Sequence, residues 1–186
     1  MSNRLTKIVT RGGDKGETSL ADGTRLAKDD ARIALMGDVD ELNSWIGVVI
    51  AHSGAGSLAD LLTGVQHDLF DLGGGLCFPG APLLSERHVA RLDEAAADMN
   101  ANLPPLKEFV LPGGAPSVAF CHVARTVCRR VERAMAAFLR AAPEAALALQ
   151  YLNRLSDVLF IAARVEARRL GAAEVTWRKE NSISGA

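Results

Sequence analysis

Residues 121–135 read "CHVARTVCRRVERAM", and their apolar positions have the spacing of an α-helix. Val127, Val131 and Met135 recur every four residues, so they lie along one face that can pack against other helices. A second face carries charged residues at helical spacing, namely Arg125, Arg129, Glu132 and Arg133. Three arginines with one carboxylate make this face electropositive, so it would accept an anionic partner. The alternative is an ordinary solvated face.

Helical periodicity extends from this segment in both directions. The helix itself is expected from about Ser117 to Arg140, and the next one has Pro143 in its first turn and ends near Gly171. Three more helices are predicted before Ser117, and they are bounded by glycines, prolines or a capping serine. The first runs from Lys28 to the interruption at Gly54 and Gly56. The second starts at Ser57 and is ended or weakened by Gly73, Gly74 and Gly75, and the third runs from Ser85 to Pro104 and Pro105.

Strand signals are almost absent from the sequence. The only short candidates are "EFVLP", residues 108–112, and "AEVTWR", residues 173–178. The 186 residues are therefore expected to form one all-α domain, a five-helix bundle with a structured N-terminal loop. We assign residues 1–27 to the loop, 28–171 to the bundle and 172–186 to a C-terminal tail.

The overall composition excludes several classes of protein. A formal net charge of −1 gives no general attraction to nucleic acids or to anionic membranes. The longest wholly apolar run, residues 158–163, is too short to cross a bilayer, and residues 1–10 lack the apolar stretch of a secretory signal. The three cysteines form no CxxC pair, so neither a disulfide framework nor a zinc site is indicated. We expect a cytoplasmic protein with reduced thiols.

The N-terminal stretch "VTRGGDKGETSLADGTRLAKDDAR", residues 9–32, has the composition of an anion-binding loop. Glycines leave backbone N–H groups free to approach an anion, and cations lie beside them. The glycines are Gly12, Gly13 and Gly16, and the cations are Arg11, Lys15 and Lys28. A disordered tail would have a similar composition, so this alternative stays open on the loop alone.

The fifth predicted helix contains "YLNRLSDVLF", residues 151–160, with a polar stripe of its own. Asn153, Asp157 and Arg164 keep helical spacing, and an asparagine in mid-helix suggests a hydrogen-bonding task. Two polar stripes and a glycine-rich loop together are typical of a polyphosphate site. The sequence has no GxxxxGK[ST] phosphate loop, no Glu-x-x-His pair of a di-iron bundle and no GxSxG nucleophile motif. The four histidines share no metal-ligand spacing.

Six blocks occur in order along nearly the whole chain: "TRGGDKGETSL", "KDD", "GDVDELNSWIG", "FVLPGG", "ARTVCRRVER" and "YLNRLSDVLF". Together they resemble the PduO-type ATP:cob(I)alamin adenosyltransferases. The resemblance implies a ferritin-like five-helix bundle, which agrees with the helices expected from periodicity. It also implies a homotrimer with active sites between subunits, ATP bound by the N-terminal loop, and a corrinoid bound beside the ATP.

The resemblance implies a role for individual residues as well. The ATP contacts would be Thr10, Arg11, Gly12, Gly13, Thr18, Ser19, Lys28, Arg129, Arg130, Glu132, Arg133 and Asn153. Arg125 would pair across the subunit interface with Asp40. Phe109 would line the lower face of the corrinoid, with Phe160 as a second residue of that wall. Arg129, Arg125 and Phe109 are the residues that we expect to act in catalysis.

The chemistry that the resemblance implies suits this set of residues. Reduced cobalt would attack the C5′ carbon of ATP and release triphosphate, so orientation and charge neutralisation matter more than a general base. Mg²⁺ would bind mainly through the ATP phosphates, and a cob(II)alamin reductase and a cobalamin-dependent enzyme would be protein partners. The alternatives are a non-catalytic sensor or delivery protein that binds nucleotide or adenosylcobalamin, and a purely structural helical bundle.

Overall fold

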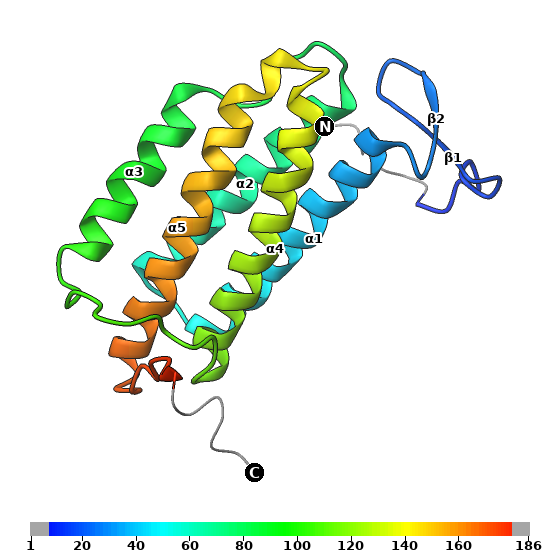
Figure 1. Ribbon diagram of the computed structural model, residues 1–186. Helices are drawn as coiled ribbons and strands as arrows, with labels where there is room; N and C mark the ends of the chain where they lie inside the picture. The colour runs from blue at the N-terminus through cyan, green and yellow to red at the C-terminus, as the bar shows by residue number, and fades with distance from the viewer. Residues whose placement is uncertain (1–7, 180–186) are drawn as a thin grey trace.

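The computed structural model describes residues 8–179, and these residues form the predicted all-α bundle (Figure 1). Its helices are α1 (Ala31–Ser53), α2 (Ser57–Cys77), α3 (Glu86–Asn100), α4 (Pro116–Leu139) and α5 (Ala146–Arg169), with a short 3₁₀ turn, η1 (Pro143–Ala145), before α5. The expected helix limits are confirmed to within a few residues. The ends of the predicted loop and tail, residues 1–7 and 180–186, lie outside the described residues. No helix within 8–179 is long and apolar enough to cross a membrane.

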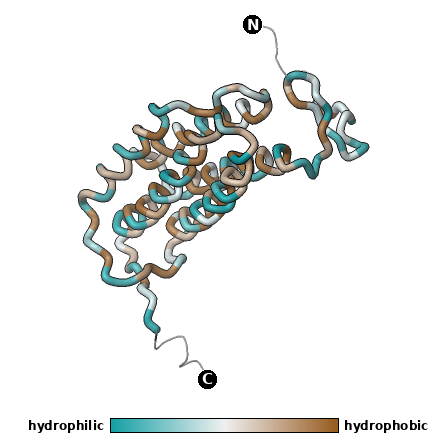
Figure 2. Tube along the Cα trace, turned by 45° about the horizontal axis from the view of Figure 1, so that its top comes forward, coloured by the Kyte–Doolittle hydropathy of each residue, from teal (hydrophilic) through white to brown (hydrophobic). Residues whose placement is uncertain are grey.

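Helix α4 lies at the centre of the packing. It packs against α1 on one side and α5 on the other, while α2 packs on α1 and α3 packs on α5. The apolar stripes predicted from spacing face inward, and Figure 2 shows the hydrophobic residues gathered on the inner sides of the helices. Leu42, Ile46, Leu69, Val131 and Leu155 are fully buried. Each such side chain stabilises the fold by about 2 kcal/mol relative to an exposed one.

The residues at the N-termini of the helices explain why the helix limits predicted from the sequence agree with the structure. The Asp30 side chain caps α1 by accepting a hydrogen bond from the Arg32 backbone N–H at 2.8 Å, and Ser85 forms a capping box with His88 at the start of α3. Pro116 stands in the first turn of α4, where its missing N–H costs no helical hydrogen bond. Each of these residues is adjacent in sequence to the helix that it begins, so it can be recognised without knowing the tertiary structure.

The glycine run in α2 behaves differently from the expectation. Gly73, Gly74 and Gly75 neither end nor break the helix, which continues to Cys77. A Cβ atom on Gly75 would lie 2.8 Å from Leu83 Cδ2 and 3.0 Å from its Cα. Gly75 therefore lets the chain that leaves α2 fold back tightly against the helix, which is a tertiary requirement that local propensity cannot show.

The N-terminal loop is structured as expected, and it contains a short hairpin that the sequence did not predict. Strands β1 (Glu17–Ser19) and β2 (Arg25–Ala27) pair antiparallel, with Thr18 opposite Leu26. Buried Leu20, and a hydrogen bond of 3.1 Å from the Ala21 N–H to the Cys77 carbonyl, anchor the hairpin at the end of α2. In Figure 1 the hairpin projects beyond the first turn of α1, away from α3 and α5.

The two segments with strand character pair with each other at the opposite end of the bundle. Val110 and Thr176 form an isolated antiparallel bridge. The Leu111 N–H donates to the Val175 carbonyl at 2.8 Å, and the Trp177 N–H donates to the Phe109 carbonyl at 2.7 Å. The described part of the predicted tail is therefore packed along the loop that connects α3 to α4.

Candidate functional site

A groove runs along the outer side of α4 and α5 and is built from three adjoining hollows. The first, about 480 Å³, is lined by Arg129, Glu132, Arg133 and Asn153. The second, about 320 Å³, shares Arg129 with the first and adds Arg125, Asp157 and Phe160. The third, about 480 Å³, shares Arg125 and Phe160 with the second and extends to Leu106 and Phe109. Because neighbouring hollows share residues, we treat them as one feature, the α4–α5 groove.

The charged end of the α4–α5 groove holds the residues predicted from the polar stripes of the two helices. Asn153 Nδ2 donates to Glu132 Oε1 at 2.9 Å, which orients both side chains across the groove. The Arg133 guanidinium donates to the Arg129 carbonyl at 2.9 Å. Within residues 8–179, neither arginine has an ion-pair partner, and both are exposed. This end therefore presents two free cations, the geometry that binds phosphate oxygens well.

Arg125 lies in the middle of the groove in an electrostatically unfavourable setting. Its Nε is buried and has no hydrogen-bond partner within the described chain. Burial, together with the nearby charge of Arg129, lowers the pKa of the Arg125 guanidinium. A buried donor without a partner costs free energy, so an anion or a carboxylate placed here would be stabilised. Buried His122, whose pKa is lowered by desolvation and by Arg125, lies behind this position with its ring centroid 6.2 Å from that of Phe160.

The other end of the groove is aromatic. Phe160 on α5 is half-buried, and Phe109 in the α3–α4 loop leaves 81% of its surface exposed. Both line the same hollow, which opens on one side to solvent. An exposed phenylalanine in a concave site is typical of a surface that contacts a large apolar ligand.

The N-terminal loop is closed by a residue that the sequence analysis did not single out. Arg25 on β2 donates to the Gly12 carbonyl at 3.1 Å and to Ser19 Oγ at 3.2 Å, and pairs with Glu17 at 3.3 Å. These contacts fold the glycine segment back over the hairpin. The role of Arg25 follows from the cross-strand pairing of the hairpin. The sequence analysis did not predict this pairing, so it could not identify Arg25.

Lys28 and Gly13 face each other across this loop. The Lys28 N–H donates to the Gly16 carbonyl at 2.8 Å, and a Cβ atom on Gly13 would lie 2.9 Å from Lys28 Nζ. A side chain at Gly13 would therefore displace the lysine. Thr10 Oγ1 accepts a hydrogen bond from the Gly12 N–H at 3.4 Å, and Arg11 has a positive φ of 59°. Thr18 and Ser19 lie on β1, where consecutive side chains point to opposite faces of the hairpin.

Several predicted residues are not brought together within one chain. Figure 1 shows the hairpin beyond the first turn of α1, apart from most of the length of α4 and α5, the helices that line the groove. Arg130 points to α1 instead of the groove, where it pairs with Asp38 at 3.1 Å and with Glu41. Asp40 is exposed, and no ion pair joins it to Arg125 among residues 8–179 of one chain. Within one chain, the loop residues, Arg130 and Asp40 therefore lie outside the groove.

The expectation that Arg164 continues the polar stripe of Asn153 and Asp157 was wrong. Arg164 is buried, with 5% of its side chain exposed, and pairs with Glu174 at 2.9 Å. It ties the C-terminal segment to α5 and takes no part in the groove. Cys121 and Cys128 are buried free thiols, as expected, and Cys77 is half-buried. No group of three or more potential metal ligands occurs in the part of the chain that the structure describes.

Comparison with known proteins gives a consistent result. The cobalamin adenosyltransferase family profile matches residues 8–166. The chain is 50% identical to a cobalamin adenosyltransferase of Cupriavidus metallidurans, covering 97% of this chain and 98% of that one. It is 46% identical to a corrinoid adenosyltransferase of Mycobacterium tuberculosis, covering 96% of each chain. A variant of the PduO-type ATP:corrinoid adenosyltransferase from Lactobacillus reuteri, solved with cobalamin and ATP, superposes with a TM-score of 0.84 at 33% identity, covering 93% of this chain and 100% of that one.

Proposed function

The chain belongs to the cobalamin adenosyltransferase family, and on that premise we propose that its α4–α5 groove holds ATP and a corrinoid next to each other. The protein is an ATP:corrinoid adenosyltransferase. One observation carries the assignment of the site. The cationic hollow at Arg129 and Arg133 and the aromatic hollow at Phe109 and Phe160 each share lining residues with the hollow at Arg125. A polyanion and a large apolar ring system fit these two ends in that order.

The reaction transfers the 5′-deoxyadenosyl group from ATP to the reduced corrinoid. The electron pair of Co(I) forms the bond to C5′, the C5′–O bond breaks, and its electron pair leaves with triphosphate. No side chain has to accept or supply a proton in this step. The protein therefore contributes by aligning cobalt with C5′ and by neutralising the charge that builds on the leaving group.

Arg129 and Arg133 suit the neutralising role because a guanidinium binds phosphate oxygens with two parallel hydrogen bonds. The hydrogen bond from Asn153 to Glu132 holds both side chains ready at the edge of the same hollow. From the N-terminal loop, further ATP contacts would come from Thr10, Arg11, Gly12, Gly13, Thr18, Ser19 and Lys28. Arg130 also stays a proposed ATP contact, although its ion pairs with α1 orient it away from the groove in a single chain.

Mg²⁺ is proposed as the metal that accompanies ATP. Because no cluster of three potential ligands exists among residues 8–179, the ion would take most of its oxygen ligands from the phosphates and water. When bound, it adds positive charge beside the leaving triphosphate. The arginines of the groove would supply further positive charge beside the triphosphate.

On the corrinoid side, Phe109 and Phe160 are proposed to cover the lower face of the ring. An apolar wall there excludes water and an axial base from cobalt, and losing the axial ligand makes reduction to Co(I) easier. The exposure of Phe109 supports this role because the ring contributes little to the packing of the bundle. A cob(II)alamin reductase and a cobalamin-dependent enzyme are the proposed protein partners. A cytoplasmic location stays a prediction from the sequence.

A homotrimer is proposed as the working assembly, with each site shared by two subunits. The separation of hairpin and groove within one chain supports sharing, and so does the position of Asp40. Arg130 engages Asp38 and Glu41 within the chain, so Asp40 is the carboxylate of this turn that is open to a neighbour. We assign Arg125 as its partner. If they pair, Arg125→Ala and Asp40→Ala together should cost much less assembly free energy than the sum of the single changes, whereas additive losses would contradict the pairing.

Turnover is the direct test of the function. Chemically reduced cobalamin and ATP, mixed with the protein, should yield adenosylcobalamin and triphosphate in equal amounts. ATP at 100 times its dissociation constant should also raise the unfolding free energy by about 2.7 kcal/mol. Stabilisation by ATP without any product would instead indicate the non-catalytic binding or delivery protein.

A further inference from the structure

The position of Phe109 depends on its backbone, because its side chain touches little of the protein. With 81% of its surface exposed, the ring gains no anchoring from burial. Its carbonyl accepts a hydrogen bond from the Trp177 N–H at 2.7 Å, and the following Leu111 N–H donates to the Val175 carbonyl at 2.8 Å. The C-terminal segment, residues 172–177, is thus the support against which the Phe109 loop is aligned.

That segment is in turn fixed by one buried arginine. Arg164 Nε donates to Glu174 Oε1 at 2.9 Å, and a terminal nitrogen of its guanidinium donates to Glu174 Oε2 at 3.3 Å. The same nitrogen donates to the Pro104 carbonyl at 2.8 Å. Arg164 therefore holds both the start of the Phe109 loop and the segment that supports its middle. An ion pair between a buried guanidinium and a half-buried carboxylate, with two contacts and a third acceptor, has the geometry in which charge-assisted hydrogen bonds are strong.

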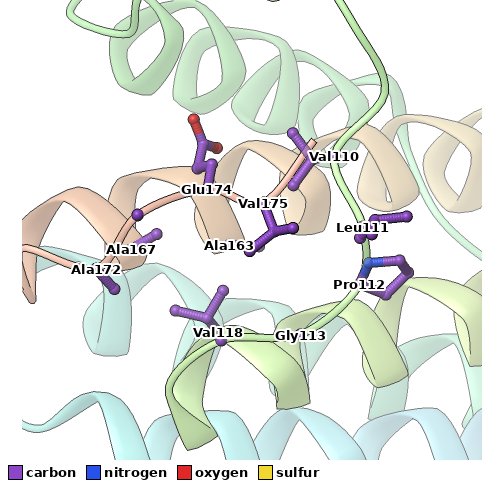
Figure 3. Close-up of a pocket in the computed structure, with 12 residues that line it drawn as sticks. Val110, Leu111, Pro112, Gly113, Val118, Ala163, Ala167, Ala172, Glu174 and Val175 are labelled. Atoms are coloured by element: carbon purple, nitrogen blue, oxygen red, sulfur yellow. The ribbon is translucent and has the colours of Figure 1, made fainter. Parts of the chain in front are cut away.

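Apolar packing beneath the loop is incomplete. A cavity of about 240 Å³ lies under residues 110–114. Figure 3 shows Val110, Leu111 and Pro112 on one side of it and Ala167 and Ala172 on the other. Leu111 and Pro112 are exposed, so little apolar burial holds this part of the loop. The loop is consequently held by hydrogen bonds at its edge more than by what lies under it.

We propose that the Arg164–Glu174 pair is a positioning device for corrinoid binding, acting through the C-terminal segment on the Phe109 loop. The inference rests on the proposed function, because it takes the aromatic end of the groove as the corrinoid site. Neither Arg164 nor Glu174 touches the groove. Substitution of either residue should therefore weaken corrinoid binding and leave ATP binding unchanged.

Glu174→Gln is the informative variant because it keeps the size of the side chain and removes its charge. We expect the N–H groups of Leu111 and Trp177 to exchange with solvent at least about tenfold faster, as the loss of a charged hydrogen bond predicts. The KM for cob(I)alamin should rise at least about tenfold, while the KM for ATP stays within about twofold. Arg164→Lys, which keeps the charge but not the two-point contact, should give a smaller change in the same direction.

Asp93→Asn is the matched control. It removes a carboxylate from the ion pair between Asp93 and Arg154, which links α3 to α5 away from the loop. This variant should change neither the exchange of the two N–H groups nor the KM for the corrinoid. Thermal unfolding and the ATP-dependent stabilisation check that each variant is folded.

The outcomes separate the two levels of inference. Unchanged exchange at Leu111 and Trp177 in folded Glu174→Gln would overturn the proposal, and so would faster exchange with an unchanged KM for the corrinoid. Wild-type protein that makes no adenosylcobalamin would contradict the proposed function instead. The exchange measurement needs no substrate, so it would still decide whether the pair holds the loop.

Discussion

Arg129 lies where the cationic hollow of the α4–α5 groove meets the central one. If it neutralises the leaving triphosphate, Arg129→Ala should lower turnover by about 10²-fold, equivalent to roughly 3 kcal/mol of transition-state stabilisation. Arg140→Ala, at an exposed position just after the same helix, is the matched control and should retain normal turnover. Wild-type rates for Arg129→Ala at saturating ATP would remove the residue from the phosphate site.

Phe109 tests the other end of the groove. Phe109→Ala should leave ATP binding unchanged but slow the formation of adenosylcobalamin from cob(II)alamin at least about tenfold, or by about 1.4 kcal/mol of activation free energy. The slowing should be smaller when Co(I) is supplied chemically, because the apolar wall acts on the reduction. The optical spectrum of bound cob(II)alamin with ATP present reports whether the axial ligand has been lost.

Phe70→Ala provides the comparison for that experiment. Phe70 is also exposed, at 71%, but lies on α2 away from the groove. Phe70→Ala should form adenosylcobalamin from cob(II)alamin at the wild-type rate and give the wild-type optical spectrum. A Phe109 variant with the same four-coordinate cob(II)alamin spectrum as the wild type would show that the corrinoid wall lies elsewhere.

At the scale of single residues, helical spacing predicted the faces of α4 and α5 but not the partners of each arginine. One position along a helix turns a side chain by about 100°, so Arg130 points to α1 while Arg129 and Arg133 line the groove. The carboxylates that engage Arg130 and Arg164 come from other segments of the chain. Their pairing depends on how the helices pack, which no local pattern contains.

At the scale of the helices, Glu166 on α5 links three elements at one end of the bundle. It accepts hydrogen bonds from Arg169 at 2.7 Å and from Ser117 of α4 at 2.7 Å, and Arg169 also donates to the Ser53 carbonyl at the end of α1. These contacts, led by the one from Arg169, hold the pKa of the buried Glu166 carboxyl below 4.5. Its ionised form is therefore favoured in the folded protein.

The consequence is a defined dependence of stability on pH. The folded-state pKa is below that of the unfolded chain, so the contribution of Glu166 is fully present above about pH 4.5 and is lost as the pH falls through the lowered pKa. Glu166→Gln should unfold at lower denaturant concentration at pH 7 and lose less stability than the wild type on acidification. Denaturant titrations at several pH values measure this. Equal acid sensitivity of both proteins would contradict the linkage.

The elements themselves differ in how well the sequence predicted them. Caps, prolines and apolar stripes determine the five helices within residues 8–179, and all of these signals are local. The hairpin was missed because β1 and β2 have three residues each, too few for an alternating pattern. The segments "EFVLP" and "AEVTWR" were recognised as strand-like, but their pairing brings together residues more than 60 positions apart and needed the folded bundle.

For the whole molecule, the important relation is between the N-terminal loop and the α4–α5 groove. Each carries predicted ATP-binding residues, yet no loop residue lines the groove in one chain, and the hairpin lies beyond the first turn of α1 (Figure 1). Contacts between subunits leave no periodic signal in a sequence, so a site shared by two subunits was predicted only from the family resemblance. The proposed site completed by two subunits would account for the separation, for the exposed Asp40 and for the Nε of Arg125, which has no partner within residues 8–179.

A mixed-subunit experiment tests this shared site. One variant carries Arg11→Ala and Lys28→Ala in the loop, and the other carries Arg129→Ala in the groove. All three side chains are exposed, so the fold should tolerate the changes. Each variant alone should be nearly inactive, because every one of its sites has one defective half.

Adenosylcobalamin formation by the two variants, co-expressed and purified together without separating mixed from parent assemblies, is the measurement that tests the shared site most directly. If a loop and a groove from different subunits form each site, random mixing in equal amounts restores both halves at about a quarter of the sites. We therefore predict recovery to about a quarter of wild-type activity. Mixed assemblies verified by mass that stay as inactive as the two parents would show that loop and groove do not combine across subunits.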